Sequence, residues 1–231
     1  MARRVHGRTG LLAACMLLAA AALSAAPAQD NKGSLVVGDF SLPPGDSGLP
    51  SPWKSVKRAG TPDFSLLREG DMATLVVRSH KASFGFQRET KVKVDDYPFI
   101  SWKWKATKLP AGGDYRHAGT DDQAAQIYVA FSKTRIIEYI WDTSAKEGSS
   151  GDAAGLPPFV SIKVLVLRSG PADVGKWLTE RRNLREDYER LFGKPTGPLV
   201  AEGVQLQINS QHTGTEAAAA FADIVFEKAD K

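Results

Sequence analysis

The stretch Val204-Gln-Leu-Gln-Ile-Asn-Ser-Gln211 alternates apolar and polar residues. Successive side chains of a β-strand point to opposite faces, so this alternation predicts a strand with one buried face. The buried face would carry Val204, Leu206 and Ile208. The other face would carry a row of neutral carboxamides, from Gln205, Gln207, Asn209 and Gln211. Strands of this kind are typical of antiparallel sheets that pack on a core with one face only.

Working outward from this stretch, similar short segments follow one another along the chain. Predicted strands cover 35–40, 64–68, 73–78, 84–88, 99–105, 123–132, 136–142, 160–168, 204–211 and 217–227. The segments 64–68 and 73–78 flank Glu69-Gly70-Asp71, which is the signature of a hairpin. Many short strands with no internal repeat and no linker predict a mostly β fold, an antiparallel jelly-roll β-sandwich. We expect it to form a single domain over residues 29–231, with its first and last strands meeting.

One peripheral α-helix is expected at about residues 180–192. Asn183 can cap it, and Glu186 stands three residues later, as a capping box requires. Gly193 and Pro195 then mark its end. Trp177 and Leu178 would extend this helix backwards or pack beside it.

Residues 1–28 read as a signal peptide. Three arginines precede an apolar run at 11–26, and Ala26-Pro27-Ala28 offers the small residues at which signal peptidase cleaves. This predicts a protein that is periplasmic or secreted, with no transmembrane segment after cleavage. A retained anchor is the alternative, and a lipoprotein signal ending at Cys15 is a second one.

Composition excludes several classes of function. Beyond residue 28 the chain has no cysteine, so that part can form no disulfide and has no thiol nucleophile. Loss of the three signal-peptide arginines would leave basic and acidic residues nearly balanced, which argues against nucleic acid as a partner. The sequence contains no nucleophile elbow, no phosphate-binding loop and no metal-ligand spacing of histidines. No catalytic signature therefore points to an enzyme.

Several motifs carry a resemblance to a known family. They are YPFISWKW (97–104), LPAGGD (109–114), DDQAA (121–125), YIWD (139–142), LRSG (167–170) and the stretch 177–193. Together they resemble the bacterial exported proteins called domain of unknown function 3047. The strand pattern of that family is similar to galactose-binding-like jelly rolls and carbohydrate-binding modules. The resemblance implies a fold, and it brings no catalytic residue to this chain.

The carboxamide row is the leading candidate site. In the segment 123–132, Gln126 and Tyr128 share one face, and they would join the row if the two strands share a sheet. Amides both donate and accept hydrogen bonds, which suits the hydroxyl groups of a sugar. We therefore expect a polar concave face that recognises a neutral polar ligand such as a glycan. Its members would be Gln126, Tyr128, Gln205, Gln207, Asn209, Gln211, Trp102 and His212. A plain solvent-facing sheet is the alternative, and Trp102 would then belong to the core.

Two other functions remain open. Glu138, Asp142, Asp121 and Asp122 could serve a carboxylate-dependent glycan hydrolase or lyase. Glu138 and Asp142 lie four residues apart, about 13 Å along a strand, which exceeds the separation that paired glycosidase carboxylates need. Either would need a partner from another strand. The third alternative is a structural or assembly protein of the cell envelope.

A structural calcium ion is the one cofactor hypothesis. Asp121 with Asp122, or Asp39 with Asp223 on the terminal strands, could supply oxygen ligands. The alternative is turn chemistry, in which the same carboxylates accept backbone N–H groups. The sequence leaves open the strand order, the identity of the ligand and the oligomeric state.

Overall fold

The computed structural model of the chain describes residues 29–31, 33–154 and 156–229. The predicted signal peptide, 1–28, and Cys15 within it lie outside the described residues. In the described part, no helix is long and apolar enough to cross a membrane.

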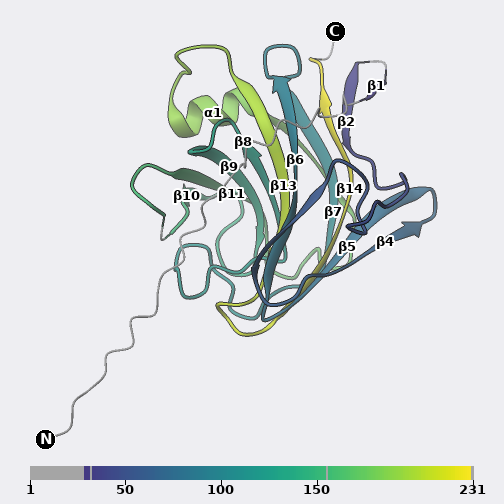
Figure 1. Cartoon of the computed structure of the whole chain (residues 1–231). Helices are drawn as coiled ribbons and strands as arrows, with labels where there is room; N and C mark the ends of the chain where they lie inside the picture. Colours follow the sequence, from purple (N-terminus) through teal and green to yellow (C-terminus); the bar gives the residue numbers. More distant parts are fainter. Residues whose placement is uncertain (1–28, 32, 155, 230–231) are drawn as a thin grey trace, which may run out of the picture.

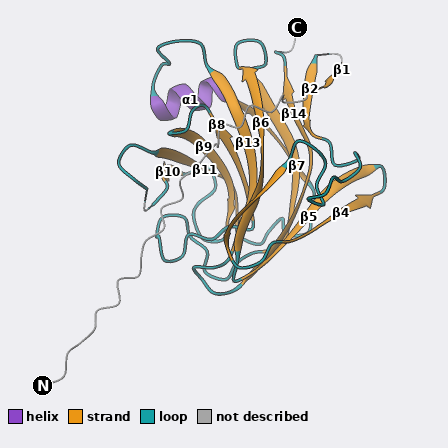
Figure 2. Ribbon diagram, viewed as in Figure 1, coloured by secondary structure: helices purple, strands orange, loops and turns teal. Residues whose placement is uncertain are grey.

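The strands form two seven-stranded sheets that face each other (Figures 1 and 2). In the first sheet β12 (Leu178–Asn183) pairs with β7 (Phe99–Lys108), and β7 pairs with the long β14 (Glu216–Glu227). The other side of β14 is shared by β5 (Met72–His80) and β2 (Ser34–Gly38). On the far side of these strands, β5 pairs with β4 (Asp63–Glu69) and β2 pairs with β1 (Gln29–Asn31).

The second sheet has the order β10-β11-β9-β8-β13-β6-β3. Its strands are β3 (Lys54–Ala59), β6 (Ser83–Lys93), β8 (Ala125–Ala130), β9 (Arg135–Asp142), β10 (Ser150–Asp152), β11 (Ser161–Ser169) and β13 (Val200–Asn209). All of its pairs are antiparallel except β9 with β11.

This arrangement confirms the predicted jelly-roll β-sandwich. The hairpin at Glu69-Gly70-Asp71 joins β4 and β5, with Gly70 at φ 62°, a conformation that glycine adopts without steric cost. The first and last long strands also meet as expected, because Gly38 of β2 pairs with Ile224 of β14. The parallel pair β9–β11 departs from the expected antiparallel pairing, and the long connection 143–160 allows it.

The helix α1 (Leu184–Phe192) has the predicted cap but a later start. Asn183 Oδ1 accepts from the backbone N–H groups of Arg185 (3.1 Å) and Glu186 (3.2 Å). Asn183 Nδ2 donates to Glu186 Oε1 at 2.8 Å, which completes the capping box. Residues 178–183 are not helical but form the edge strand β12. They pair with β7, and Glu180 on β12 accepts from Trp104 Nε1 at 3.1 Å.

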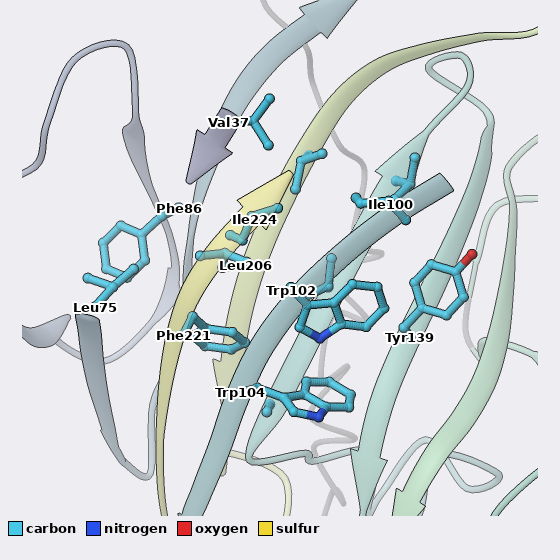
Figure 3. Packing of buried hydrophobic residues seen from close by; sticks show 14 of the residues in the cluster. Val37, Leu75, Phe86, Ile100, Trp102, Trp104, Tyr139, Leu206, Phe221 and Ile224 are labelled. Carbon is cyan, nitrogen blue, oxygen red and sulfur yellow. The ribbon is translucent and has the colours of Figure 1, made fainter. Parts of the chain in front are cut away.

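The core lies between the two sheets and is rich in aromatic rings (Figure 3). Trp102 and Trp104 on β7 meet at a centroid distance of 5.5 Å, close to perpendicular. Trp102 also packs against Tyr139 of β9 at 5.3 Å, and Trp104 packs against Trp141 at 6.0 Å. Such tilted ring pairs stabilise a core beyond the area that they bury.

Trp102 is therefore a core residue, and its expected place in a ligand site is wrong. Its side chain is fully buried between the sheets (Figure 3). The carboxamide row stands on the opposite face of the second sheet, since Val204, Leu206 and Ile208 are the residues of β13 that enter the core. Trp102 buries its large aromatic ring in the core, so the ring is not available to a ligand at the surface.

Candidate functional site

The candidate site lies on the outer face of the second sheet, away from the core. β8 and β13 are direct neighbours, as the sequence hypothesis required. Gln205 stands opposite Tyr128, and Gln207 stands opposite Gln126. Residues that pair in this way share one face of a sheet, so the polar side chains of the two strands converge.

These side chains bond to one another. Gln207 Nε2 donates to Gln126 Oε1 at 3.3 Å, and the Tyr128 hydroxyl donates to the same oxygen at 2.6 Å. Gln126 Nε2 donates in turn to Asn209 Oδ1, and Asn209 Nδ2 donates to the carbonyl oxygen of Asp121 at 2.7 Å. We call Gln126, Tyr128, Gln205, Gln207 and Asn209 the amide network.

The amide network is buried although it faces away from the core. Its most exposed member, Tyr128, shows only 7% of its surface. Smaller apolar clusters flank it on the same face, one around Ile140 and Val164 and another around Ile136 and Ile162. The face is thus neither a plain solvated sheet surface nor part of the main core.

Gln205 is the member whose hydrogen bonding is incomplete. Its Nε2 donates to Gln207 Oε1 at 2.7 Å, whereas its Oε1 is buried and has no partner among the described residues. Beneath it, a Cβ atom at Gly85 would lie 3.4 Å from Gln205 Nε2 and 2.4 Å from the carbonyl oxygen of Leu206. Glycine at position 85 is therefore required by the backbone of β13, whereas its contact with the amide of Gln205 is an ordinary one. A buried acceptor without a donor is unfavourable and rare in folded proteins.

Glu138 adds a carboxyl group to this face. It stands on β9 directly opposite Tyr128, and it is 5% exposed. Burial, together with the nearby charge of Asp121, raises the pKa of Glu138 to about 8, although the positive charge of Arg58 acts in the opposite direction. At neutral pH the group is therefore mostly protonated, so it can donate a hydrogen bond.

Asp121 lies in the loop before β8, at the end of the network. Its Oδ1 accepts from Gln123 Nε2 at 2.9 Å. Burial raises the pKa of Asp121 to about 6, while the bond from Gln123 and the nearby His212 act in the opposite direction. Two carboxyl groups with raised pKa values thus belong to one face.

The other two candidate carboxylates have structural partners. Asp142 is fully buried and accepts from the backbone N–H groups of Tyr115 (3.0 Å), Ser144 (2.8 Å) and Ala145 (2.7 Å). Asp122 is also buried and accepts from the backbone N–H groups of His212 (3.3 Å) and Thr213 (2.6 Å). These bonds are the turn chemistry that the sequence left as the alternative.

Gln211 and His212 do not belong to the amide network. β13 ends at Asn209, so the expected row of four carboxamides stops before Gln211. Both residues lie in the following turn, where the side-chain amide oxygen of Gln211 accepts from Nε2 of His212 at 3.2 Å. The exposed His212 ring places its Nδ1 3.0 Å from the carbonyl oxygen of Asp121, near one end of the network.

The second proposed calcium pair is also engaged elsewhere. Asp39 Oδ1 accepts from the backbone N–H of Ser41 at 2.9 Å, and Asp223 forms an ion pair with Lys103 at 2.8 Å. In residues 29–31, 33–154 and 156–229, no group of three or more His, Cys, Asp or Glu side chains could hold a metal ion. Calcium binding by Asp39, Asp223, Asp121 and Asp122 stays a prediction.

Arg58 and Gln87 are two residues of this face that sequence reasoning missed. Arg58 on β3 donates from Nε to Gln207 Oε1 at 3.2 Å. Gln87 on β6 stands opposite both Gln205 and Lys54. The stretch Lys54-Ser-Val-Lys-Arg-Ala59 lacks strict alternation, because it is an exposed edge strand, and it predicts no strand. Only the pairing of β3 with β6 places Arg58 beside the amides.

Comparison with solved structures finds weak similarity to several enzymes. The xyloglucanase domain of NopAA, a type three effector from Sinorhizobium fredii solved in complex with cellobiose, is 11% identical with a TM-score of 0.46. The match covers 89% of this chain and all of that one. Endoglucanase 3 of family GH12 from Trichoderma harzianum is 10% identical with a TM-score of 0.43, covering 87% and 100%. Endoglucanase cel12A from Rhodothermus marinus is 8% identical with a TM-score of 0.42, covering 77% and 97%. Similarity at this level assigns no activity or ligand to the chain.

Comparison of sequences gives a more definite result. No curated protein matches the chain. One family model matches residues 51–225, a segment that contains every member of the amide network together with Arg58, Gln87 and Glu138. The resemblance stated from the motifs is thereby confirmed, and the chain belongs to the family described as "Protein of unknown function (DUF3047)".

Proposed function

We propose that this protein binds a hydroxyl-rich ligand, most naturally a glycan, at the outer end of the amide network. The observation that carries the proposal is the unpartnered Gln205 Oε1, a buried acceptor at the edge of a set of amides that otherwise satisfy one another. A ligand hydroxyl group supplies the missing donor. Because this oxygen is buried in the unliganded protein, binding includes a side-chain movement at this end of the network.

The chemistry of the surrounding groups agrees with a hydroxyl-rich ligand. A sugar hydroxyl both donates and accepts, and so do the amides of Gln205 and Gln207. Protonated Glu138 and the Tyr128 hydroxyl add further groups of this kind on the neighbouring strands. Packed apolar residues on β9 and β11 exclude water from one side of the network, which strengthens such hydrogen bonds.

The test is the substitution Gln205→Leu. We expect it to weaken binding of the best ligand on a glycan array at least tenfold, about 1.4 kcal/mol, when measured by calorimetry. Unfolding free energy should change by no more than about 1 kcal/mol. The leucine removes an unsatisfied oxygen together with one bond, and Gln207 Oε1 keeps the bond from Arg58.

Thr179→Val is the matched control, since it exchanges an exposed polar residue on β12 of the other sheet for an apolar one. It should leave binding unchanged. If the folded protein binds none of the arrayed glycans, or binds them equally well with leucine at position 205, the proposal is wrong.

A second candidate function, cleavage of a glycan, is favoured by the two carboxyl groups. Glu138 and Asp121 have pKa values raised to about 8 and about 6, so near pH 7 the first is protonated and the second ionised. Acid and base carboxyl groups of glycosidases differ in this way. Release of new reducing ends from a bound glycan, abolished separately by Glu138→Gln and Asp121→Asn, would establish it. Binding without release would leave the protein a binding domain.

A further inference from the structure

Arg58 is a half-buried cation on the rim of the candidate site. It belongs to β3, the edge strand of the second sheet, and it reaches the amide network through the bond from its Nε to Gln207 Oε1. Within the described part of the chain, its terminal Nη groups make no hydrogen bond or ion pair. A guanidinium offers five N–H donors in a planar fork, so most of its capacity is unused.

No carboxylate of the described residues neutralises Arg58 by direct contact. Glu138 stands on the same face, and the positive charge of Arg58 acts to lower its pKa. Burial and the charge of Asp121 outweigh this effect and raise that pKa to about 8, so Glu138 is mostly uncharged at neutral pH. Asp121 lies before the start of β8, and Glu89 stands opposite Gly203 on β6. Neither forms an ion pair with Arg58. A partly buried cation beside a dry network is costly unless an anion pairs with it.

Lys54 adds a second positive charge along the same rim. It lies on β3 opposite Gln87, which in turn stands opposite Gln205, so the three side chains share one face of the sheet. Lys54 is exposed and forms no ion pair among the residues that the structure describes. The edge of the site next to Gln205 and Gln207 is therefore positively charged.

We infer that Arg58 binds the carboxylate of an acidic glycan, a uronic acid, whose hydroxyl groups lie on the amide network. The inference rests on the proposed function and adds the class of sugar. Arginine pairs with a carboxylate through two parallel N–H···O bonds, for which the Nη groups and geometry of Arg58 are suited. Gln207 holds the guanidinium in place through Nε. This ligand differs from the neutral one that the sequence predicts.

The experiment compares glycan pairs that differ only in charge. Oligosaccharides containing glucuronic or galacturonic acid are measured by calorimetry beside their neutral glucose or galactose counterparts of the same linkage and length. The protein is used as wild type and as Arg58→Gln, Arg58→Lys and Arg78→Gln. Arg78 is the matched control, since it is a half-exposed arginine on β5 of the other sheet, paired with Asp63 at 3.6 Å.

We expect wild type to bind the acidic member at least tenfold more tightly than its neutral partner. Arg58→Gln should remove this preference, Arg58→Lys should restore it only in part because an ammonium lacks the fork, and Arg78→Gln should leave it intact. Equal binding of both members, unaffected by Arg58→Gln, would overturn the inference while the proposed function stands. Absence of binding to every member would overturn the proposed function itself.

Discussion

Glu138→Gln is expected to stabilise the protein in alkaline solution and to remove most of its pH dependence between pH 6.5 and 8. The pKa of Glu138 is about 8 in the folded protein and near 4.5 when the chain is unfolded. Within that window the folded state keeps a proton that the unfolded state has lost. Folding stability therefore falls as pH rises, by about 1.4 kcal/mol per pH unit. Below pH 4.5 Glu138 is protonated in both the folded and the unfolded state, so it adds no pH dependence to the folding stability.

Urea unfolding at a series of pH values measures this slope. Wild type should lose on the order of several kcal/mol between pH 5 and 8, whereas Glu138→Gln should be nearly flat above pH 6.5. Asp121→Asn is the control. The pKa of Asp121 is raised only to about 6, so that variant should flatten the curve below pH 6. It also removes the negative charge that helps to raise the pKa of Glu138, so the slope above about pH 6 should persist but end at a lower pH than in wild type. An unaltered slope in Glu138→Gln would mean that Glu138 is ionised in the folded protein.

Trp102→Ala is expected to lower the free energy of unfolding by about 3–5 kcal/mol. Trp102 is fully buried, and its loss leaves a cavity bordered by Trp104 and Tyr139. Small domains are stable by about 5–15 kcal/mol in total, so this variant would be near the limit of folding. Chemical denaturation followed by circular dichroism measures the change.

Trp102→Phe keeps this prediction testable if the alanine variant fails to fold. Trp102 Nε1 is buried without a partner, so phenylalanine removes an unsatisfied donor as well as part of the ring. We expect a cost below about 2 kcal/mol and unchanged glycan binding, because the side chain faces the core. A folded Trp102→Phe protein that no longer binds its glycan would return Trp102 to the ligand site.

Local patterns predicted the longer strands of both sheets and the cap of the helix, but not the edge strands β3 and β12. Alternation along 204–211 identified β13, and the turn at Gly70 identified the hairpin of β4 and β5. Such signals are local, because a strand shows its two faces in its own sequence. Alternation also predicts that Gln126 and Tyr128 lie beside the amides if β8 and β13 are neighbours, and the two strands do pair.

Which residues belong to the candidate site could be established only from the tertiary structure. Arg58 joins it through an edge strand with little alternation, and Glu138 joins it because β9 pairs with β8. Gln211 leaves it because β13 ends at Asn209. Burial of Glu138, which raises its pKa, depends on the residues around it and on nothing in its own segment.

The sequence by itself determined that this protein is a β-sandwich whose strand β13 presents neutral amides on the face away from the core. The tertiary structure alone decided that these amides are buried, that they bond to one another, and that Gln205 lacks a partner while Arg58 stands beside them. The physical reason is the separation along the chain over which each property is determined. Alternation and turns act between residues close in the chain, whereas hydrogen-bond partners, burial and charge are set by strands that lie far apart in the sequence.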